Sequence, residues 1–176
     1  MHSARTLRTH RSALQFARGV RGGVLTISRL RWRRSRRRKP QHTTCFEDLA
    51  AALRVWAKGL LCLEAAVELL IGNRSWLFRE DFHEIGVEFG WEVFSGQPLA
   101  AVDFVAVAGA LEAGVLPCSG GEGRVLRIAA SIAEGVPVDM REAVTGLDEG
   151  NAVLAAAAVL RAAGHLGLRG VLRGER

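Results

Sequence analysis

The sequence predicts an all-α fold, a compact bundle of five to seven helices joined by short loops. Two observations favour this fold class. Apolar residues recur at alternating steps of three and four between residues 44 and 72, a spacing that lays one apolar stripe along a helix. Capping residues and glycines then divide the second half of the chain into short helical segments. Because an apolar stripe is unstable in water, we expect these later segments to cover it.

The stripe supplies the first helical segment of the bundle. Thr44 and Glu47 form a T-x-x-E capping box at its start, and Gly72 with Asn73 is suited to the left-handed backbone that ends a helix. Gly59 interrupts the pattern midway, so it either kinks one long helix or separates two shorter ones. The stripe consists of Phe46, Leu49, Leu53, Trp56, Leu60, Leu63, Val67 and Leu70.

A second helical segment follows the stripe and then gives way to a different periodicity. Ser75 is a suitable cap for a helix from 76 to about 85, with Phe78 and Phe82 facing inward. From residue 87, apolar and polar or small residues alternate, which is the spacing of a strand. The nearest possible partner strand is 99–102. A small hairpin within 87–102 and a helix running into an irregular apolar loop both remain open.

The caps of four more helices lie between residues 103 and 165. The last of these helices is rich in Ala and Val, so neighbouring helices can approach its backbone closely, and we expect it to be central. The caps are Asp103 for a helix over 104–113, Ser119 with Glu122 for a helix ending near Gly135, Asp139 for a short helix to Thr145, and Asp148 for the last helix over 149–163.

The cap and turn motifs of this half carry a resemblance. Over residues 103–165 the chain resembles a group of small actinobacterial helical proteins of uncharacterised function. The resemblance implies the helix boundaries given above and no activity, so no functional residue is carried over from it. Its motifs are the runs LPCSGGE at 116–122, EGVPVD at 134–139 and TGLD at 145–148.

The charge distribution divides the chain into a basic arm, 1–41, a helical domain, 42–166, and a tail, 167–176, that we expect to fray. Residues 1–40 contain thirteen Arg or Lys and no acid, whereas residues 41–176 have a net charge of −7. A self-repelling arm with few apolar residues does not offset its ordering entropy, so we expect it to be disordered.

Three interpretations of the arm stay open. It is a non-functional extension from an upstream start, a targeting peptide, or an arm that binds nucleic acid. In the third case guanidinium groups grip phosphates and an aromatic ring stacks on a base. The residues that would make those contacts are Arg31, Trp32, Arg33, Arg34, Arg36, Arg37, Arg38 and Lys39.

Polar motifs predict no catalytic, cofactor or metal site. Residues 119–124 are glycine-rich and open a helix, but they lack the lysine and spacing of a P-loop, so we interpret them as a capping box. Glu80 and His83 form an E-x-x-H pair, but the second such pair of a di-iron bundle is missing. The unit 139–164 has the outline of a helix-turn-helix but only Arg161 as a base in its second helix, which argues against DNA readout.

The three cysteines show neither a disulfide framework nor C-x-x-C zinc spacing, and we expect buried structural thiols in a reducing cytoplasm. Cys118 precedes a helix, where the dipole lowers a thiol pKa, so it is the best candidate for a reactive cysteine. Arginine is strongly favoured over lysine, twenty-two to two, which is typical of a GC-rich bacterial genome. No run of eighteen uncharged apolar residues exists, so no membrane span is predicted.

We expect Trp56, Trp76 and Trp91 to lie mostly in the core. If the least regular segment is exposed instead, its aromatic residues Phe89, Trp91 and Phe94 are the candidates for contact with a protein partner. We therefore predict a small soluble helical protein without catalytic activity that acts through protein–protein contacts. The alternative is a nucleic-acid-associated protein that binds phosphates through its arm.

Overall fold

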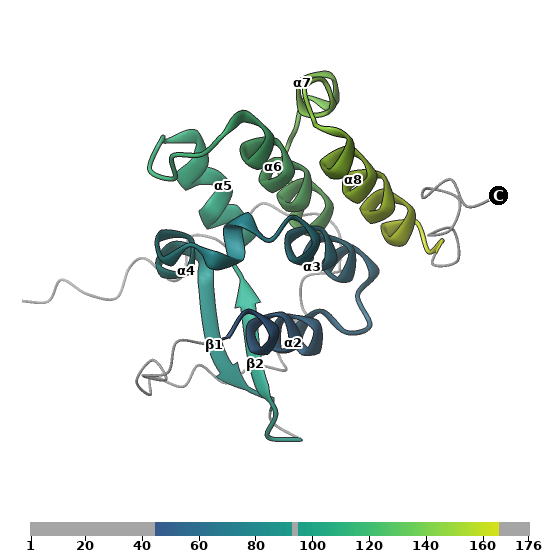
Figure 1. Ribbon diagram of the computed structural model, residues 1–176. Coiled ribbons are helices and arrows are strands. Elements are labelled where there is room, and N and C mark those ends of the chain that lie inside the picture. The colour runs from purple at the N-terminus through teal and green to yellow at the C-terminus, as the bar shows by residue number, and fades with distance from the viewer. Residues whose placement is uncertain (1–44, 93–94, 166–176) are drawn as a thin grey trace, which may run out of the picture. The chain divides into compact units, whose positions relative to one another are not determined.

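The computed structural model describes residues 45–92 and 95–165. This part of the chain is mostly helical, with seven α-helices, one 3-10 turn and a two-stranded antiparallel sheet (Figure 1). The prediction of a helical bundle is confirmed in this coarse form, although a strictly all-α description omits the sheet. The elements are α2 (Phe46–Ala57), α3 (Leu61–Asn73), η1 (Ser75–Phe78), α4 (Glu80–Gly86), β1 (Val87–Trp91), β2 (Pro98–Val102), α5 (Phe104–Glu112), α6 (Gly120–Glu134), α7 (Met140–Val144) and α8 (Glu149–Ala162).

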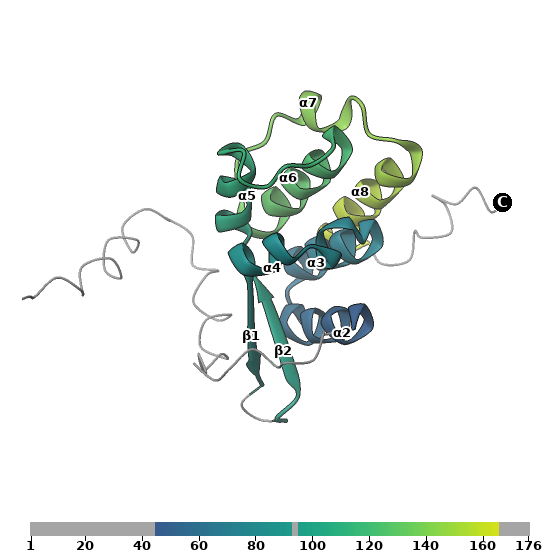
Figure 2. The same cartoon turned by 60° about the vertical axis from the view of Figure 1, so that its left-hand side comes forward.

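Helix α3 is the centre of this arrangement. It packs against α2, α6 and α8, and six of its apolar residues are buried (Figures 1 and 2). The expectation that the last helix is central is wrong. Helix α8 buries only Ala155 and Ala158, because it lies on one side of α3 and leaves its opposite face to solvent. Small side chains there allow a close approach to α3 without making α8 central.

The long apolar stripe is divided into α2 and α3. Gly59 adopts a positive φ of 86° between them, and its N–H donates to the Glu64 carboxylate at 2.9 Å, so the second helix starts anew. The N-cap of α2 is Cys45, one residue after the predicted Thr44, which lies outside the described residues. The Cys45 thiol donates to the Glu47 carboxylate at 2.8 Å.

The predicted helix over 76–85 is wrong in its first half. Residues 75–78 form the 3-10 turn η1, and Arg79 has an extended backbone, so α4 begins only at Glu80. The Arg79 guanidinium lies 4.7 Å from the centre of the Trp76 ring and donates to the Pro117 carbonyl at 2.6 Å, which anchors this break. Phe82 is buried as expected, but Phe78 is 63% exposed.

The hairpin alternative for 87–102 is confirmed. Strand β1 pairs antiparallel with β2, with Phe89 opposite Ala100 and Trp91 opposite Pro98. Helix α2 packs against β2. Ala100 and Val102 are buried in the main core, and Phe89 packs against its edge.

The four predicted caps of the second half are confirmed. Ser119 and Glu122 bond reciprocally, with N···O distances of 3.3 Å to the Ser119 hydroxyl and 2.9 Å to the Glu122 carboxylate. Asp103, Asp139 and Asp148 each accept from backbone N–H groups at the start of α5, α7 and α8. The helix ends fall within two residues of their predicted positions, which is the normal uncertainty of such boundaries.

Predictions about the basic arm and the frayed tail concern residues 1–44 and 166–176, which lie outside the described residues. Within 45–92 and 95–165, no helix has both the length and the apolar character needed to cross a membrane.

Candidate protein-contact site

The end of the β1–β2 hairpin is the candidate protein-contact site. The two strands extend past α2, so their far end lies beyond the helix that covers them (Figures 1 and 2). Trp91 is the last residue of β1, and its side chain is 59% exposed. Its cross-strand neighbour Pro98 is also exposed.

The strand register explains why an indole lies exposed here. Side chains alternate between the two faces of a strand, so Trp91 shares a face with Val87 and Phe89. Directly opposite residues of an antiparallel pair also share a face, which places Ala100 and Val102, both buried in the core, on that same side. Trp91 therefore continues the core-facing side of the sheet beyond the point where the core ends.

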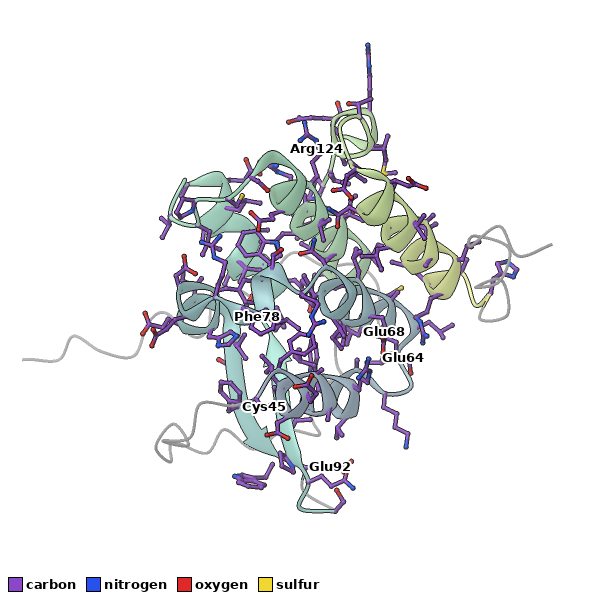
Figure 3. The ribbon with its side chains drawn as sticks, viewed as in Figure 1. Cys45, Glu64, Glu68, Phe78, Glu92 and Arg124 are labelled. Carbon is purple, nitrogen blue, oxygen red and sulfur yellow. The ribbon has the colours of Figure 1, made fainter. Side chains whose placement is uncertain are left out.

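Backbone hydrogen bonds fix the connection between the strands. The Glu92 N–H donates to the Gln97 carbonyl and the Gly96 N–H to the Glu92 carbonyl, both at 2.9 Å. Gly96 adopts a φ of 65°, and the Ser95 hydroxyl donates to the Glu92 carboxylate. Figure 3 shows Glu92 at this far end of the hairpin. Phe94, the third predicted contact residue, lies outside the described residues.

Sequence reasoning missed a second exposed aromatic group. Phe78, labelled in Figure 3, stacks on Phe46 with ring centres 5.0 Å apart. The Arg74 guanidinium lies 4.6 Å from the Phe46 ring centre and 5.7 Å from that of Phe78. The acidic pair Glu80 and Asp81, which favours a new helix start, was the sequence signal that separated Phe78 from α4.

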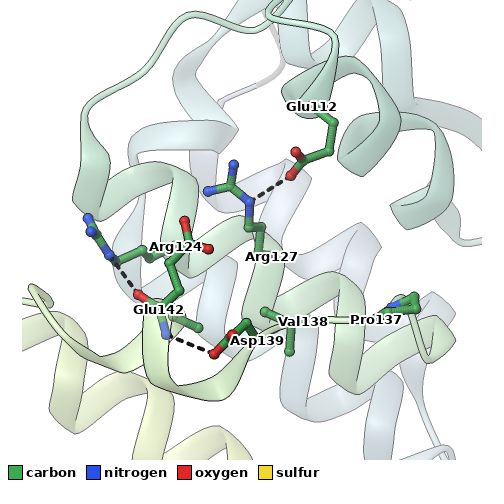
Figure 4. A pocket seen from close by; sticks show the side chains of 8 residues that line it. Glu112, Arg124, Arg127, Pro137, Val138, Asp139 and Glu142 are labelled. Atoms are coloured by element: carbon green, nitrogen blue, oxygen red, sulfur yellow. Dashed lines mark hydrogen bonds and ion pairs between the residues drawn. The ribbon is translucent and has the colours of Figure 1, made fainter.

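A cavity of about 250 Å³ lies between α6, α7 and the segment that joins them (Figure 4). Both of its guanidinium groups are engaged within the fold: Arg127 pairs with Glu112 at 2.7 Å, and Arg124 donates to the Glu142 carbonyl at 3.1 Å. These contacts hold α5 and α7 on α6. The residues that line the cavity are Glu112, Arg124, Arg127, Pro137, Val138, Asp139, Glu142 and Ala143.

At the start of α6, the Glu122 carboxylate accepts a hydrogen bond from the backbone of its own helix start. Because the Ser119 N–H donates to the Glu122 carboxylate, the pKa of Glu122 lies below its ordinary value, with Arg79 contributing in the same direction. Glu122 thus occupies the position where an external anion would bind, and Arg124 is turned towards Glu142. The interpretation of this motif as a capping box is consistent with both contacts.

The remaining polar candidates are also engaged in the fold. His83 Nε2 lies 2.9 Å from the Leu77 carbonyl oxygen. Among the residues that the structure describes, no group of three His, Cys, Asp or Glu side chains is placed to hold a metal ion. The Asn151 amide donates to Asp148, and its oxygen accepts from Asn73 at 2.9 Å, so the one amide of the helix-turn-helix outline is used internally.

The prediction of buried thiols is wrong for all three cysteines, which are exposed and free. The surroundings of the Cys118 thiol also oppose its predicted reactivity. Partial burial raises the pKa of the Cys118 thiol, and the nearby Glu122 carboxylate raises it further, outweighing the opposite influence of Arg79 and Arg127.

The residues Arg31 to Lys39, predicted to contact nucleic acid, lie outside the described residues. Of the predicted partner contacts, Phe89 and Trp91 are brought together on one face of β1. Comparisons of the chain with protein-family models, with curated proteins and with solved structures find no match.

Proposed function

We propose that this chain is a non-catalytic helical protein that acts through protein–protein contacts made by the end of its hairpin. The observation that supports this best is the 59% exposure of Trp91 on a strand whose preceding residues pack against the core. Tryptophan is the residue type most enriched where binding energy concentrates. An anchored strand presents it with little loss of conformational entropy on binding.

The anchoring supports a preformed contact surface. Strand β1 follows α4 directly, and the Asp103 N–H donates to the Gly86 carbonyl at 2.8 Å where β2 leads into α5. The base of the hairpin is thus tied to two helices while its far end projects past α2 (Figure 2). A partner that covers Trp91 would bury apolar area without first ordering the strand.

The test is site-specific photocrosslinking in living cells of the source organism. A benzophenone amino acid is placed at position 91, and the matched control carries it at Val159 on α8, which is 51% exposed. We expect discrete protein adducts from position 91 and none of the same mass from position 159. Adducts that are absent at 91, or identical at both positions, would contradict the proposal.

The alternative function is nucleic-acid association through the basic arm, supported by its thirteen Arg or Lys residues without a single acid. Binding of the full chain to duplex DNA should then weaken steeply as salt rises, and a chain lacking residues 1–40 should not bind. Binding that survives the deletion, or that is insensitive to salt, would rule out the arm as the contact.

We also assign the protein to the cytoplasm of a bacterium. The arginine-rich composition is typical of a GC-rich bacterial genome, and the three free cysteines suit a reducing compartment. Fractionation of the source cells with an antibody against the helical domain tests the compartment.

A further inference from the structure

From the geometry of the hairpin we infer that β1 pairs edge to edge with β1 of a second copy of this chain, forming a four-stranded antiparallel sheet across a two-fold axis. The inference rests on the proposed function of the hairpin end as a protein-contact surface. It specifies the partner, the register and the backbone groups involved.

Two hydrogen bonds fix which backbone groups of β1 face outwards. The Asp103 N–H donates to the Gly86 carbonyl at 2.8 Å, and the Glu92 N–H donates to the Gln97 carbonyl at 2.9 Å. Hydrogen-bonded positions alternate along an antiparallel strand, so residues 88 and 90 bond towards β2 like 86 and 92. The backbone N–H and C=O groups of Phe89 and Trp91 therefore point away from β2.

This outer edge is unpaired within 45–92 and 95–165, where the sheet contains β1 and β2 alone. Helix α2 packs against β2, and β2 lies between α2 and β1 in both ribbon views (Figures 1 and 2). Among the described residues, α2 thus covers the β2 side of the sheet and not the β1 edge. An open edge with aromatic side chains is the usual template for strand addition.

The sequence of β1, VEFGW, is self-complementary about its centre. In an antiparallel pair with Phe89 on the two-fold axis, Phe89 meets Phe89 of the second copy, and Trp91 lies opposite Val87. Glu88 then lies opposite Gly90, so no carboxylate directly opposes another. Aromatic–aromatic and aromatic–β-branched cross-strand pairs are among the stabilising ones, and opposed like charges destabilise.

The hydrogen bonds that the outward backbone groups of β1 can form are consistent with this register. Phe89 N–H and C=O exchange two bonds across the axis, and each Trp91 N–H donates to Val87 C=O of the other copy. The Val87 N–H is already used, because it donates to His83 O within its own chain. The paired edge therefore provides four backbone hydrogen bonds and covers both Trp91 rings, an interface small enough for a weak, concentration-dependent dimer.

The experiment measures sedimentation equilibrium and amide hydrogen exchange of the full chain over a hundredfold concentration range. We expect a shift from about 19 kDa towards twice that mass. The amides of Phe89 and Trp91 should become protected at high concentration only, whereas Gly90, which bonds to β2, should be protected throughout. Trp91→Lys should abolish both concentration effects, and Met140→Lys on α7, at a residue 57% exposed, should leave them unchanged.

Three results would overturn the inference: a monomer at every concentration, a dimer that Trp91→Lys does not weaken, or protection of Phe89 and Trp91 that is independent of concentration. Circular dichroism of both variants establishes that they fold. Failure of this inference is distinct from failure of the proposed function, because adducts of other masses from position 91 would still identify a different protein partner.

Discussion

The indole N–H of Trp76 donates to the backbone carbonyl of Glu122 across 46 positions of the chain, with an N···O distance of 3.0 Å. Trp76 is fully buried in η1, and Glu122 lies in the first turn of α6. This single bond ties the break between α3 and α4 to the helix that carries the capping box. The Arg79 guanidinium lies over the same ring, 4.7 Å from its centre.

Trp76→Phe should therefore destabilise the protein by about 1–3 kcal/mol, because it removes the donor and leaves part of the ring volume empty. The free energy of unfolding from urea titration measures the change. Trp91→Phe is the matched control, since the Trp91 ring is 59% exposed. A loss in the control as large as that of Trp76→Phe would contradict the assignment of Trp76 to the core and Trp91 to the surface.

Two glycines that lie against side chains should respond differently to alanine. A Cβ at Gly86 would lie 2.0 Å from Val107 Cγ1, and a β-branched side chain in a helix has essentially one rotamer with which to respond. A Cβ at Gly72 would lie 2.5 Å from Leu154 Cδ2, the far end of a flexible side chain.

We expect Gly86→Ala to cost about 1–3 kcal/mol by overpacking. Gly72→Ala should be close to neutral, because the helix propensity of alanine, about 1 kcal/mol better than glycine, offsets the shift of Leu154. Thermal unfolding of the two variants measures the difference. Equal destabilisation by both substitutions would contradict this prediction, because it would mean that the Val107 and Leu154 side chains move aside equally well.

The sequence predicts those features of this fold that depend on contacts between residues close together in the chain. The caps at Asp103, Ser119, Asp139 and Asp148 are local, because a side chain bonds to a backbone group two or three residues away, and these predictions are confirmed. The exposure of Phe78 is not local. It results from the position of Arg79, whose contacts with Trp76 and the distant Pro117 interrupt the helix.

The candidate site also combines local features, which the sequence predicts, with tertiary features, which it does not. The alternation of β1 is a local pattern and predicts a strand, but the point at which α2 stops covering the sheet is set by tertiary packing. Sequence alone therefore named Trp91 as a candidate contact only if its segment is exposed. It favoured the core for Trp91, which is wrong, because this residue is 59% exposed. The covering of the stripe by later helices is confirmed for α3, which packs against α6 and α8. The peripheral position of α8 was not predicted, because an alanine-rich helix packs closely whether it is central or peripheral.

Stability should fall as the solution is acidified, through the helix-cap carboxylates. The Asn151 N–H donates to Asp148 and the Ser119 N–H to Glu122, and these bonds lower the pKa of each carboxyl group below its ordinary value. A group whose pKa is lowered on folding contributes stability above its unfolded pKa, and that contribution is lost as pH falls through the folded pKa.

The double variant Asp148→Asn with Glu122→Gln keeps both capping acceptors but removes their charges. Its unfolding free energy should be lower than that of the wild type at pH 7 and should change less between about pH 5 and pH 3. Urea midpoints measured across this range provide the comparison. A variant whose stability falls with acid as steeply as the wild type would exclude these two carboxylates as the source.

The Cys118 thiol should react slowly with iodoacetamide at neutral pH. Its raised pKa, caused first by burial and then by Glu122, leaves little thiolate, which is the reacting species. The measurement uses a variant with Cys45→Ser and Cys62→Ser, so that mass spectrometry follows one site. The rate should lie below that of free cysteine at the same pH and should rise when Glu122→Gln removes the neighbouring charge. If Cys118 instead reacts faster than free cysteine, the dipole of α6 outweighs burial, and this thiol is a reactive site.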